Sequence, residues 1–321
     1  MKKIVGILLL FVMVSSAATA IAANPDQNTI KELKFRKLYE SDEEFRRNID
    51  QIREITLKEK LSKEDWEKLY GLFKAVFEKL EVKFSDKDFK ILKQIIEEEK
   101  PKIRAYVYYK QRESLSTQAS SSIASYYLPR LYQPTSDINN GNGLIKTYAK
   151  VFDENVYGYH LSGKYIIEVT YVFADEDHPD WDWLYDWVRL IYWDRIQDIE
   201  TFFLVVDKSD EEVERLSFIG LELQRYNYLW YSISPIYSGT ATWEETAHER
   251  EKIYSFNTYG DHPIVYVNTW NHAMGENDNN PSMTDSSFNT WQNYVEGSRM
   301  DAENDYTTTI VYINEKIGEC P

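Results

Sequence analysis

Carboxylates recur at alternate positions in a strand-like segment of the chain, residues 194–207. Asp198 and Glu200 are two residues apart, and alternate side chains of a β-strand project from the same face. Two such carboxylates can hold a hard cation such as calcium or magnesium, which prefers oxygen ligands. Asp194 precedes them and is a candidate for ligand contact. The alternative is a structural ion pair, because a buried carboxylate needs a partner. The arginines that could supply it are Arg189, Arg195 and Arg225.

A second acidic cluster lies just upstream and is interleaved with tryptophans. It comprises Asp175, Glu176, Asp177, His178, Asp180, Trp181, Asp182, Trp183, Asp186 and Trp187. Closely spaced aspartates can wrap calcium, and Asp186 is our third metal-ligand candidate, although the glycine and final glutamate of an EF-hand loop are absent from the run. Exposed tryptophans beside carboxylates would suit a sugar-binding surface, since flat rings stack on ligands. The alternative is a solvated acidic loop whose tryptophans point inward.

The segment His262-Pro263-Ile264-Val265-Tyr266-Val267 is a β-branched run that leads to Trp270 and His272. Fully extended, the two histidines would lie about 30 Å apart, so a shared site requires the chain to turn after Trp270. We expect His272 to be the better functional candidate and Trp270 to line the same ligand site. The sequence holds no nucleophilic-serine elbow, Cys-His pair, His-Glu-x-x-His or phosphate-binding glycine loop, so hydrolysis by serine or zinc has no support.

The elements that must position these residues are predicted to be strands. From Tyr165 to Phe173 apolar and polar residues alternate, which is typical of a strand with one buried face. Similar runs occur at 199–206, 216–223, 264–269 and 306–313. Helical segments between these runs are few, so we predict an antiparallel β-sandwich over residues 120–321 rather than a parallel α/β sheet.

The preceding region, residues 24–115, has the pattern of short amphipathic helices. Three starts that resemble capping boxes, each with an acidic residue three positions after a serine, begin at Ser41, Ser62 and Ser85. Apolar residues at helical spacing follow each start, and we expect Pro101 to end the third helix. Residues 103–109 suit either a helix or a strand. The chain is therefore predicted to be α+β, with a helical region that could bind a protein partner.

The N-terminus predicts export. Lys2 and Lys3 precede the apolar run 4–14, and Ala20-Ile21-Ala22 fits the small-x-small rule for cleavage. Residues 1–22 are therefore predicted to be a signal peptide, and the mature protein to be secreted or displayed on the cell surface. An uncleaved anchor is the alternative, but a membrane span needs about 20 apolar residues. Because Cys320 is the only cysteine, the chain can form no internal disulfide.

Charge separates the two regions. Residues 24–115 carry 22 Lys and Arg against 20 Asp and Glu, whereas residues 116–321 carry 13 against 33 and eight of the nine tryptophans. Such an acidic surface repels nucleic-acid phosphates and attracts cations. We therefore expect no nucleic-acid partner. No second apolar run of membrane length follows the predicted signal peptide, so no transmembrane segment is expected.

Two segments carry a resemblance to a known family. Residues 262–267 with Asn271-His272-Ala273 resemble the His-Pro-Val-Val-Tyr-Val and Ser-His-Ala segments of the vacuolar protein sorting protein 62-like family. Residues 193–200 are similar, at Asp194, Asp198 and Glu200, to that family's Gly-Asp-His-Glu-Gly-Asp-Trp-Glu segment. The related necrosis-inducing (Nep1-like) proteins carry Gly-His-Arg-His-Asp-Trp-Glu there, on a β-sandwich.

This resemblance covers about residues 120–280 and implies a β-sandwich with a divalent cation at a lipid-headgroup pocket. The chain departs from the pattern at three positions: the motif histidine is Arg195, the motif tryptophan is Ile199 and the later glycine is Trp270. A cationic Arg195 beside Asp198 could replace the metal with an internal ion pair.

Together these patterns predict a secreted, non-enzymatic β-sandwich protein that binds a glycan or a lipid headgroup, with calcium or magnesium as the candidate cofactor. The predicted ligand-binding residues are Asp194, Arg195, Trp270 and His272, and the predicted metal ligands are Asp186, Asp198 and Glu200. One alternative is a glycan hydrolase that uses two of the carboxylates Asp194, Asp198 and Glu200 as acid and base. The other is a membrane-active toxin like the necrosis-inducing group.

Overall fold

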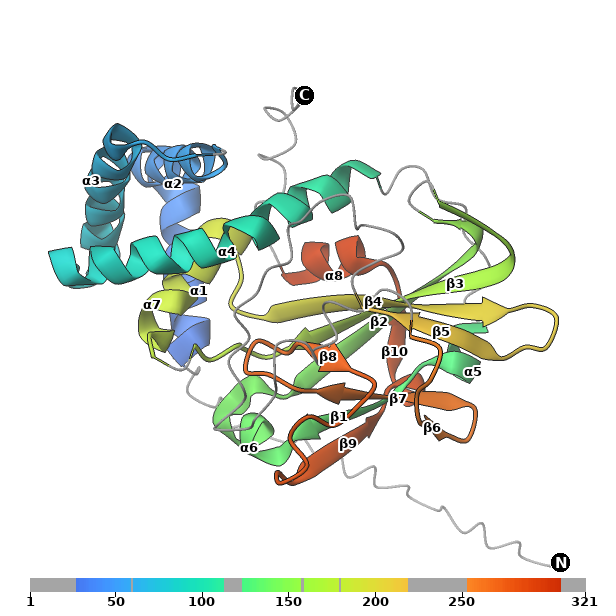
Figure 1. Cartoon of the computed structure of the whole chain (residues 1–321). Helices are drawn as coiled ribbons and strands as arrows, with labels where there is room; N and C mark the ends of the chain where they lie inside the picture. The colour runs from blue at the N-terminus through green and yellow to red at the C-terminus, as the bar shows by residue number, and fades with distance from the viewer. Residues whose placement is uncertain are drawn as a thin grey trace, which may run out of the picture.

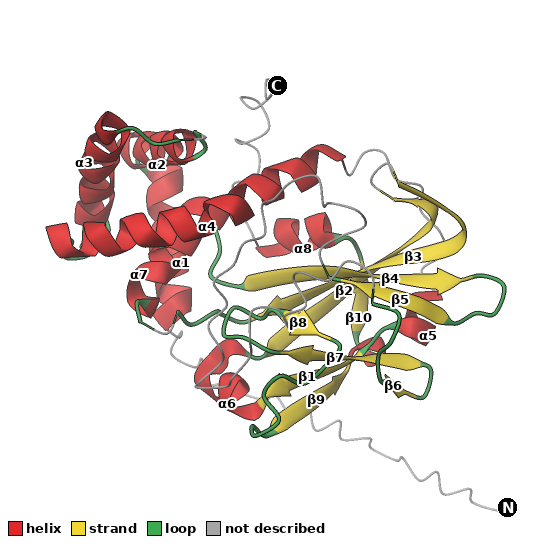
Figure 2. Cartoon of the chain, in the orientation of Figure 1, coloured by secondary structure: helices red, strands yellow, loops and turns green. Residues whose placement is uncertain are grey.

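The computed structural model describes residues 27–58, 60–112, 123–156, 159–178, 180–218 and 253–306. A group of helices comes first and two β-sheets follow (Figures 1 and 2). The α-helices are α1 (Gln27–Ser41), α2 (Glu43–Thr56), α3 (Lys63–Lys79), α4 (Asp86–Arg112), α5 (Ala124–Tyr127), α6 (Thr135–Asp137), α7 (Asp182–Trp193) and α8 (Arg299–Tyr306). Two short turns of other helix types are η3 (Ile138–Asn142) and η8 (Thr290–Gln292).

The strands form two five-stranded sheets of mixed direction. They are β1 (Arg130–Pro134), β2 (Leu144–Val156), β3 (Tyr159–Phe173), β4 (Asp198–Asp207), β5 (Val213–Ser217), β6 (Thr258–Tyr259), β7 (His262–Val267), β8 (Met274–Gly275), β9 (Asp285–Asn289) and β10 (Tyr294–Glu296). The α+β class is therefore confirmed. The predicted signal peptide, residues 307–313 of the last predicted strand and residues 219–223 of another lie outside the described residues.

The expectation of purely antiparallel sheets is wrong in two places. In the sheet ordered β10-β2-β3-β4-β5, β10 runs parallel to β2, and in the sheet ordered β6-β7-β1-β9, with β8 on β7, β1 runs parallel to β7. Hairpin turns force antiparallel pairing, whereas long connections allow either direction. Both parallel pairs join strands that are more than a hundred residues apart in the chain, so alternation within a strand could not predict their direction.

Helix α7 belongs to the same core as the N-terminal helices. Phe45 of α2, Phe77 of α3 and Ile96 of α4 are fully buried together with Val188 and Ile191 of α7. The alternative of a solvated acidic loop is therefore wrong from residue 182 onward, because Asp182–Trp193 form a helix that packs against the N-terminal helices (Figure 1). Trp187 points inward as that alternative expected, whereas Trp183 is exposed.

The helix ends agree with the sequence in part. Ser62 caps α3 in a reciprocal capping box with Asp65, as predicted. The capping residue of α2 is Asp42 rather than Ser41, because Ser41 is still the last residue of α1 and Asp42 has the extended backbone that a cap requires. Pro101 does not end α4, which continues to Arg112 with strong helix formers on both sides of the proline. Residues 103–109 are consequently helical.

The two sheets share one apolar core. Leu131 of β1 and Val265 of β7 are buried in the same cluster as Val169 of β3 and Phe202 and Leu204 of β4. Helix α8 contributes Ala302 to a smaller cluster with Ile199 on the other side of β4. No helix in the described part of the chain is both long and apolar enough to cross a membrane. The shared core brings the loop after β7 to the start of β4, where the polar residues gather (Figure 1).

Candidate functional site

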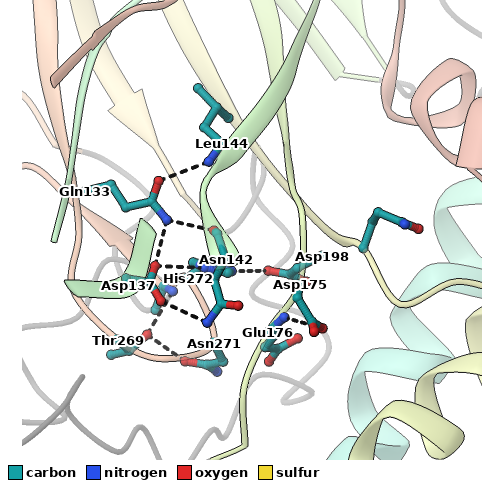
Figure 3. A network of polar contacts seen from close by, with 12 residues as sticks. Gln133, Asp137, Asn142, Leu144, Asp175, Glu176, Asp198, Thr269, Asn271 and His272 are labelled. Atoms are coloured by element: carbon teal, nitrogen blue, oxygen red, sulfur yellow. Dashed lines mark hydrogen bonds and ion pairs between the residues drawn. The ribbon is translucent and has the colours of Figure 1, made fainter. Parts of the chain in front are cut away.

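His272 lies between two carboxylates in the turn from β7 to β8. Its Nδ1 atom is 2.9 Å from Asp198 Oδ2 and its Nε2 atom is 3.2 Å from Asp137 Oδ2, as Figure 3 shows. The imidazole stacks on the ring of Phe173 with 4.0 Å between centroids, and the side chain is 0% exposed. We call Asp137, His272 and Asp198 the histidine clamp. His272 and Asp198, predicted as a ligand-binding residue and a metal ligand respectively, thus lie in direct contact.

The histidine clamp is a buried cation held by two anions. Ionised carboxylates only accept hydrogen bonds, so both ring nitrogens of His272 must donate. Burial lowers the pKa of His272, but the hydrogen bonds to Asp137 and Asp198 outweigh it and raise the pKa to about 9. With a proton on each nitrogen, the ring can neither bind a metal nor act as a base at neutral pH.

Asp137 follows β1 in the short helix α6 and was not predicted. Gln133 Nε2 donates to Asp137 Oδ2 over 2.6 Å and to the carbonyl of Asn142 over 2.9 Å. Asn142 Nδ2 donates to Asp137 Oδ1 over 3.2 Å, and Gln133 Oε1 accepts from the amide of Leu144. These bonds fix the turn between β1 and β2 and hold the carboxylate against His272 (Figure 3). A single aspartate in the run Thr-Ser-Asp carries no periodic signal that would have found it.

The arginine that pairs with Asp198 is Arg189 of α7. Its Nη2 is 3.3 Å from Asp198 Oδ1, its Nη1 pairs with Glu176 Oε2, and its Nε donates to the carbonyl of Ile196 over 2.7 Å. The ion-pair alternative for Asp198 is thus present, with Arg189 as the partner rather than Arg195. Glu200, the second predicted metal ligand, is half-buried two positions along β4. Both oxygens of Asp198 are already engaged, one by Arg189 and one by His272.

Two predicted ligand residues are held by ion pairs elsewhere. Arg195 donates to both carboxylate oxygens of Glu303 in α8, over 2.9 and 3.1 Å, and is 2% exposed. Asp194 ends α7 with a left-handed φ of 57° and pairs with Arg53 of α2 over 2.6 Å. The expected pairing of Arg195 with Asp198 is therefore wrong. The left-handed turn at Asp194 ends the helix, and Arg195 then reaches α8.

The other polar group combines carboxylates with aromatic rings, and we call it the acid–aromatic cluster. Its members are Asp175, His178, Trp181, Asp182, Tyr185, Asp186 and Trp270. His178 stacks on Trp181 with 4.9 Å between centroids and lies 4.9 Å from Trp270, whose ring is 5.7 Å from Tyr185. Trp270, predicted as a ligand residue, therefore joins this cluster and packs against both hydrophobic cores.

The carboxylates of this cluster repel one another. Burial first, and neighbouring negative charge second, raise the pKa of Asp182 to about 6 and that of Asp186 to about 7. Burial also raises the pKa of Asp175 to about 6, against the opposing charge of Arg189. Asp186, a predicted metal ligand, forms an ion pair with Lys31 of α1. The structure thus separates Asp186 from Asp198 and assigns them different cationic partners.

Groups with strongly shifted pKa values and half-buried rings are typical of functional sites. Trp181 and Asp182 are half-buried, whereas Asp137 and His272 are enclosed. Among the described residues, no group of three or more His, Cys, Asp or Glu side chains is arranged to hold a metal ion. No family model, curated protein or solved structure matches the chain. The acid–aromatic cluster is therefore the best candidate for ligand contact on its geometry alone.

Proposed function

We propose that this chain is a secreted, non-enzymatic ligand-binding protein whose two sheets form a β-sandwich. The ligand is a glycan that contacts the acid–aromatic cluster. One observation carries the proposal: Trp181 and Trp270 lie on either side of His178, in the same cluster as three carboxylates whose pKa values are raised by burial. Aromatic rings stack on the apolar faces of sugars, and carboxylates accept hydrogen bonds from sugar hydroxyls. The histidine clamp is too well paired internally to take this role.

We also propose a relationship to the vacuolar protein sorting protein 62-like family. It is supported by the meeting of Asp198 and His272, which come from the two similar segments. A lipid headgroup would be the corresponding ligand. The helical region has its own proposed role as a docking surface for a protein partner, supported by the exposed side chains of Ile30 and Leu33 on α1.

Replacing Trp181 with alanine is expected to weaken glycan binding roughly fivefold to 150-fold, if a sugar ring stacks on the indole as strongly as a nucleobase does, at about 1–3 kcal/mol. Isothermal titration calorimetry with a panel of oligosaccharides measures the change. Trp291 is a suitable control, since its ring contacts His262 and Tyr259, neither of which belongs to the acid–aromatic cluster. Equal affinities in the wild type and Trp181→Ala would contradict the proposed site.

A carboxylate-dependent glycan hydrolase is the second candidate. It is favoured by the pKa of Asp182 and of Asp186, each raised toward neutrality as a general acid requires. These two residues replace Asp194 and Asp198, whose carboxylates are engaged by Arg53, Arg189 and His272. Release of reducing ends from a bound oligosaccharide, abolished in Asp182→Asn, would favour the enzyme over the binding protein.

Calcium or magnesium is proposed as a cofactor at Asp186, one of the three predicted metal ligands. A cation present at 100 times its dissociation constant stabilises the folded state by about 2.7 kcal/mol. We therefore expect the unfolding midpoint in EDTA to rise when calcium or magnesium is added in excess, and the rise to vanish in Asp186→Asn. Identical unfolding midpoints in all buffers would contradict the proposed calcium or magnesium cofactor. The carboxylates would then be available only to an organic ligand.

A further inference from the structure

The first two turns of α1 reach into the acid–aromatic cluster. Lys31 Nζ forms an ion pair with Asp186 Oδ2, and Asn28 Nδ2 donates to Asp175 Oδ2. Lys31 Nζ also lies 3.4 Å from Asn28 Oδ1. Further along α1, Phe35 and Tyr39 are buried in the helical core. The helix is thus anchored by its second half, while its first half contacts the cluster through polar groups.

Lys31 leaves part of the cluster unsatisfied. The Asp186 side chain is 1% exposed, and its Oδ1 atom is buried yet accepts no hydrogen bond from the described residues. The same holds, within that part of the chain, for Oδ1 of Asp182. A buried polar atom without a partner costs about 1–3 kcal/mol. The cluster therefore has the capacity to accept further N–H or O–H donors.

The rings of the cluster surround His178, which also contacts one of these carboxylates. Trp181 and Tyr185 both lie against the ring of His178, and the backbone of His178 hydrogen-bonds the carboxylate of Asp182. Residues four apart on a helix are neighbours on its surface, which places Asp182 and Asp186 on one stripe of α7. The stripe presents carboxylates for a cation beside aromatic rings for an apolar surface. An amino sugar offers both, in its ammonium group and the apolar face of its ring.

We propose that Lys31 stands in for the ammonium group of the ligand, and that this ligand is a glycan with free amino groups of the glucosamine type. The incoming ammonium takes the place of Lys31 Nζ at Asp186, its remaining N–H groups reach the open oxygens, and the sugar ring stacks on Trp181. The inference rests on the proposed glycan-binding function and names its ligand. The first turns of α1 must move aside, while Phe35 and Tyr39 keep the rest of the helix in place.

Removing the lysine should strengthen binding. The apparent affinity of a site that is open only part of the time is reduced by the open fraction, so Lys31→Met is expected to bind a glucosamine tetramer about tenfold more tightly than the wild type. The N-acetylglucosamine tetramer carries no ammonium group and should bind both proteins more weakly and equally. Lys34→Met is the matched control, because Lys34 lies on the same helix and pairs with Glu81 outside the cluster.

Calorimetric titration of the four combinations decides the proposal. Equal affinity for the amino and N-acetyl tetramers in both proteins overturns the ammonium assignment and leaves glycan binding intact. If no tetramer binds, both the glycan-binding function and the ammonium assignment are wrong. If ethanolamine binds as tightly as the glucosamine tetramer, the ligand is an ammonium compound but not a sugar. If Lys31→Met does not fold, Asp186→Asn provides the test, since it must abolish the preference for the amino tetramer.

Discussion

Replacement of His272 by glutamine is expected to lower the free energy of unfolding by about 3–5 kcal/mol at pH 6, the cost of removing one partner from a buried ion pair. Without the imidazolium, the carboxylates of Asp137 and Asp198 would face each other in an enclosed site, with one cation, Arg189, left for Asp198. The amide nitrogen of glutamine can donate hydrogen bonds, but glutamine cannot supply the positive charge. Urea denaturation of both proteins measures the loss.

The pH dependence identifies the charge as the cause. The folded-state pKa of His272 is raised to about 9, above the ordinary value of 6.5. The folded state therefore binds this proton more tightly than the unfolded state, and the stabilisation is fully present below pH 6.5. It is lost as the pH rises through 9. The difference in stability between wild type and His272→Gln should shrink over that interval, whereas an equal difference at pH 6 and pH 10 would mean that the ring is neutral.

His262 provides the matched control for this variant. Its Nδ1 atom is 2.8 Å from the carbonyl oxygen of Leu128, and its ring stacks on Trp291 with 3.6 Å between centroids. No carboxylate is among these contacts. His262→Gln should therefore cost about 0.5–1.5 kcal/mol, the usual contribution of one neutral hydrogen bond. Histidine adopts a positive φ more readily than glutamine, so the left-handed φ of 52° at His272 adds a loss that is the same at every pH, and only the pH-dependent part of the loss reports the charge.

The strands that carry the histidine clamp could be predicted because they alternate. The patterns of β3, β4 and β7 follow from a period of two, whereas the contact of Asp198 with His272 joins segments 74 residues apart, which periodicity within a strand does not pair. The helix α7 could not be recognised in this way. Its residues from Leu184 to Trp193 are all buried, and its polar stripe of Asp182, Asp186 and Arg189 continues an acidic run that also suits a loop.

Ion pairs between residues far apart in the chain could not be predicted from the sequence either. Arg189, Arg195 and Arg225 were all candidate partners for Asp198. Arg189 pairs with it, whereas Arg195 is held by Glu303, 108 residues away in the chain. Lys31 comes from a region that the charge pattern had assigned to a separate module. Each of these pairs depends on how the helices pack against the sheets. Local sequence does not predict that packing, whereas it does predict the capping of α3 by Ser62, which involves only the next three residues.

Replacement of Arg189 by methionine is the second large effect that we expect, with a loss of about 3–5 kcal/mol in the free energy of unfolding. The guanidinium pairs with Glu176 and Asp198 and donates to the carbonyls of Ile196 and Gln197. Methionine fills much of the volume of the arginine side chain but makes none of these ion pairs and hydrogen bonds. Lys63→Met is the control, because its ion pair with Glu67 is exposed and spans 3.7 Å, and such pairs contribute about 0.3–0.5 kcal/mol.

The Arg189 variant also tests whether the arginine occupies the place of a cation. In the wild type Asp198 has no free oxygen, since Arg189 takes one and His272 the other. Arg189→Met releases Asp198 Oδ1 beside the carboxylate of Glu176. Hard cations prefer such oxygens, so excess calcium or magnesium should restore up to about 2.7 kcal/mol of stability to the variant at 100 times the dissociation constant. If neither ion changes the melting temperature of Arg189→Met, the guanidinium stabilises the fold and does not replace a metal at Asp198.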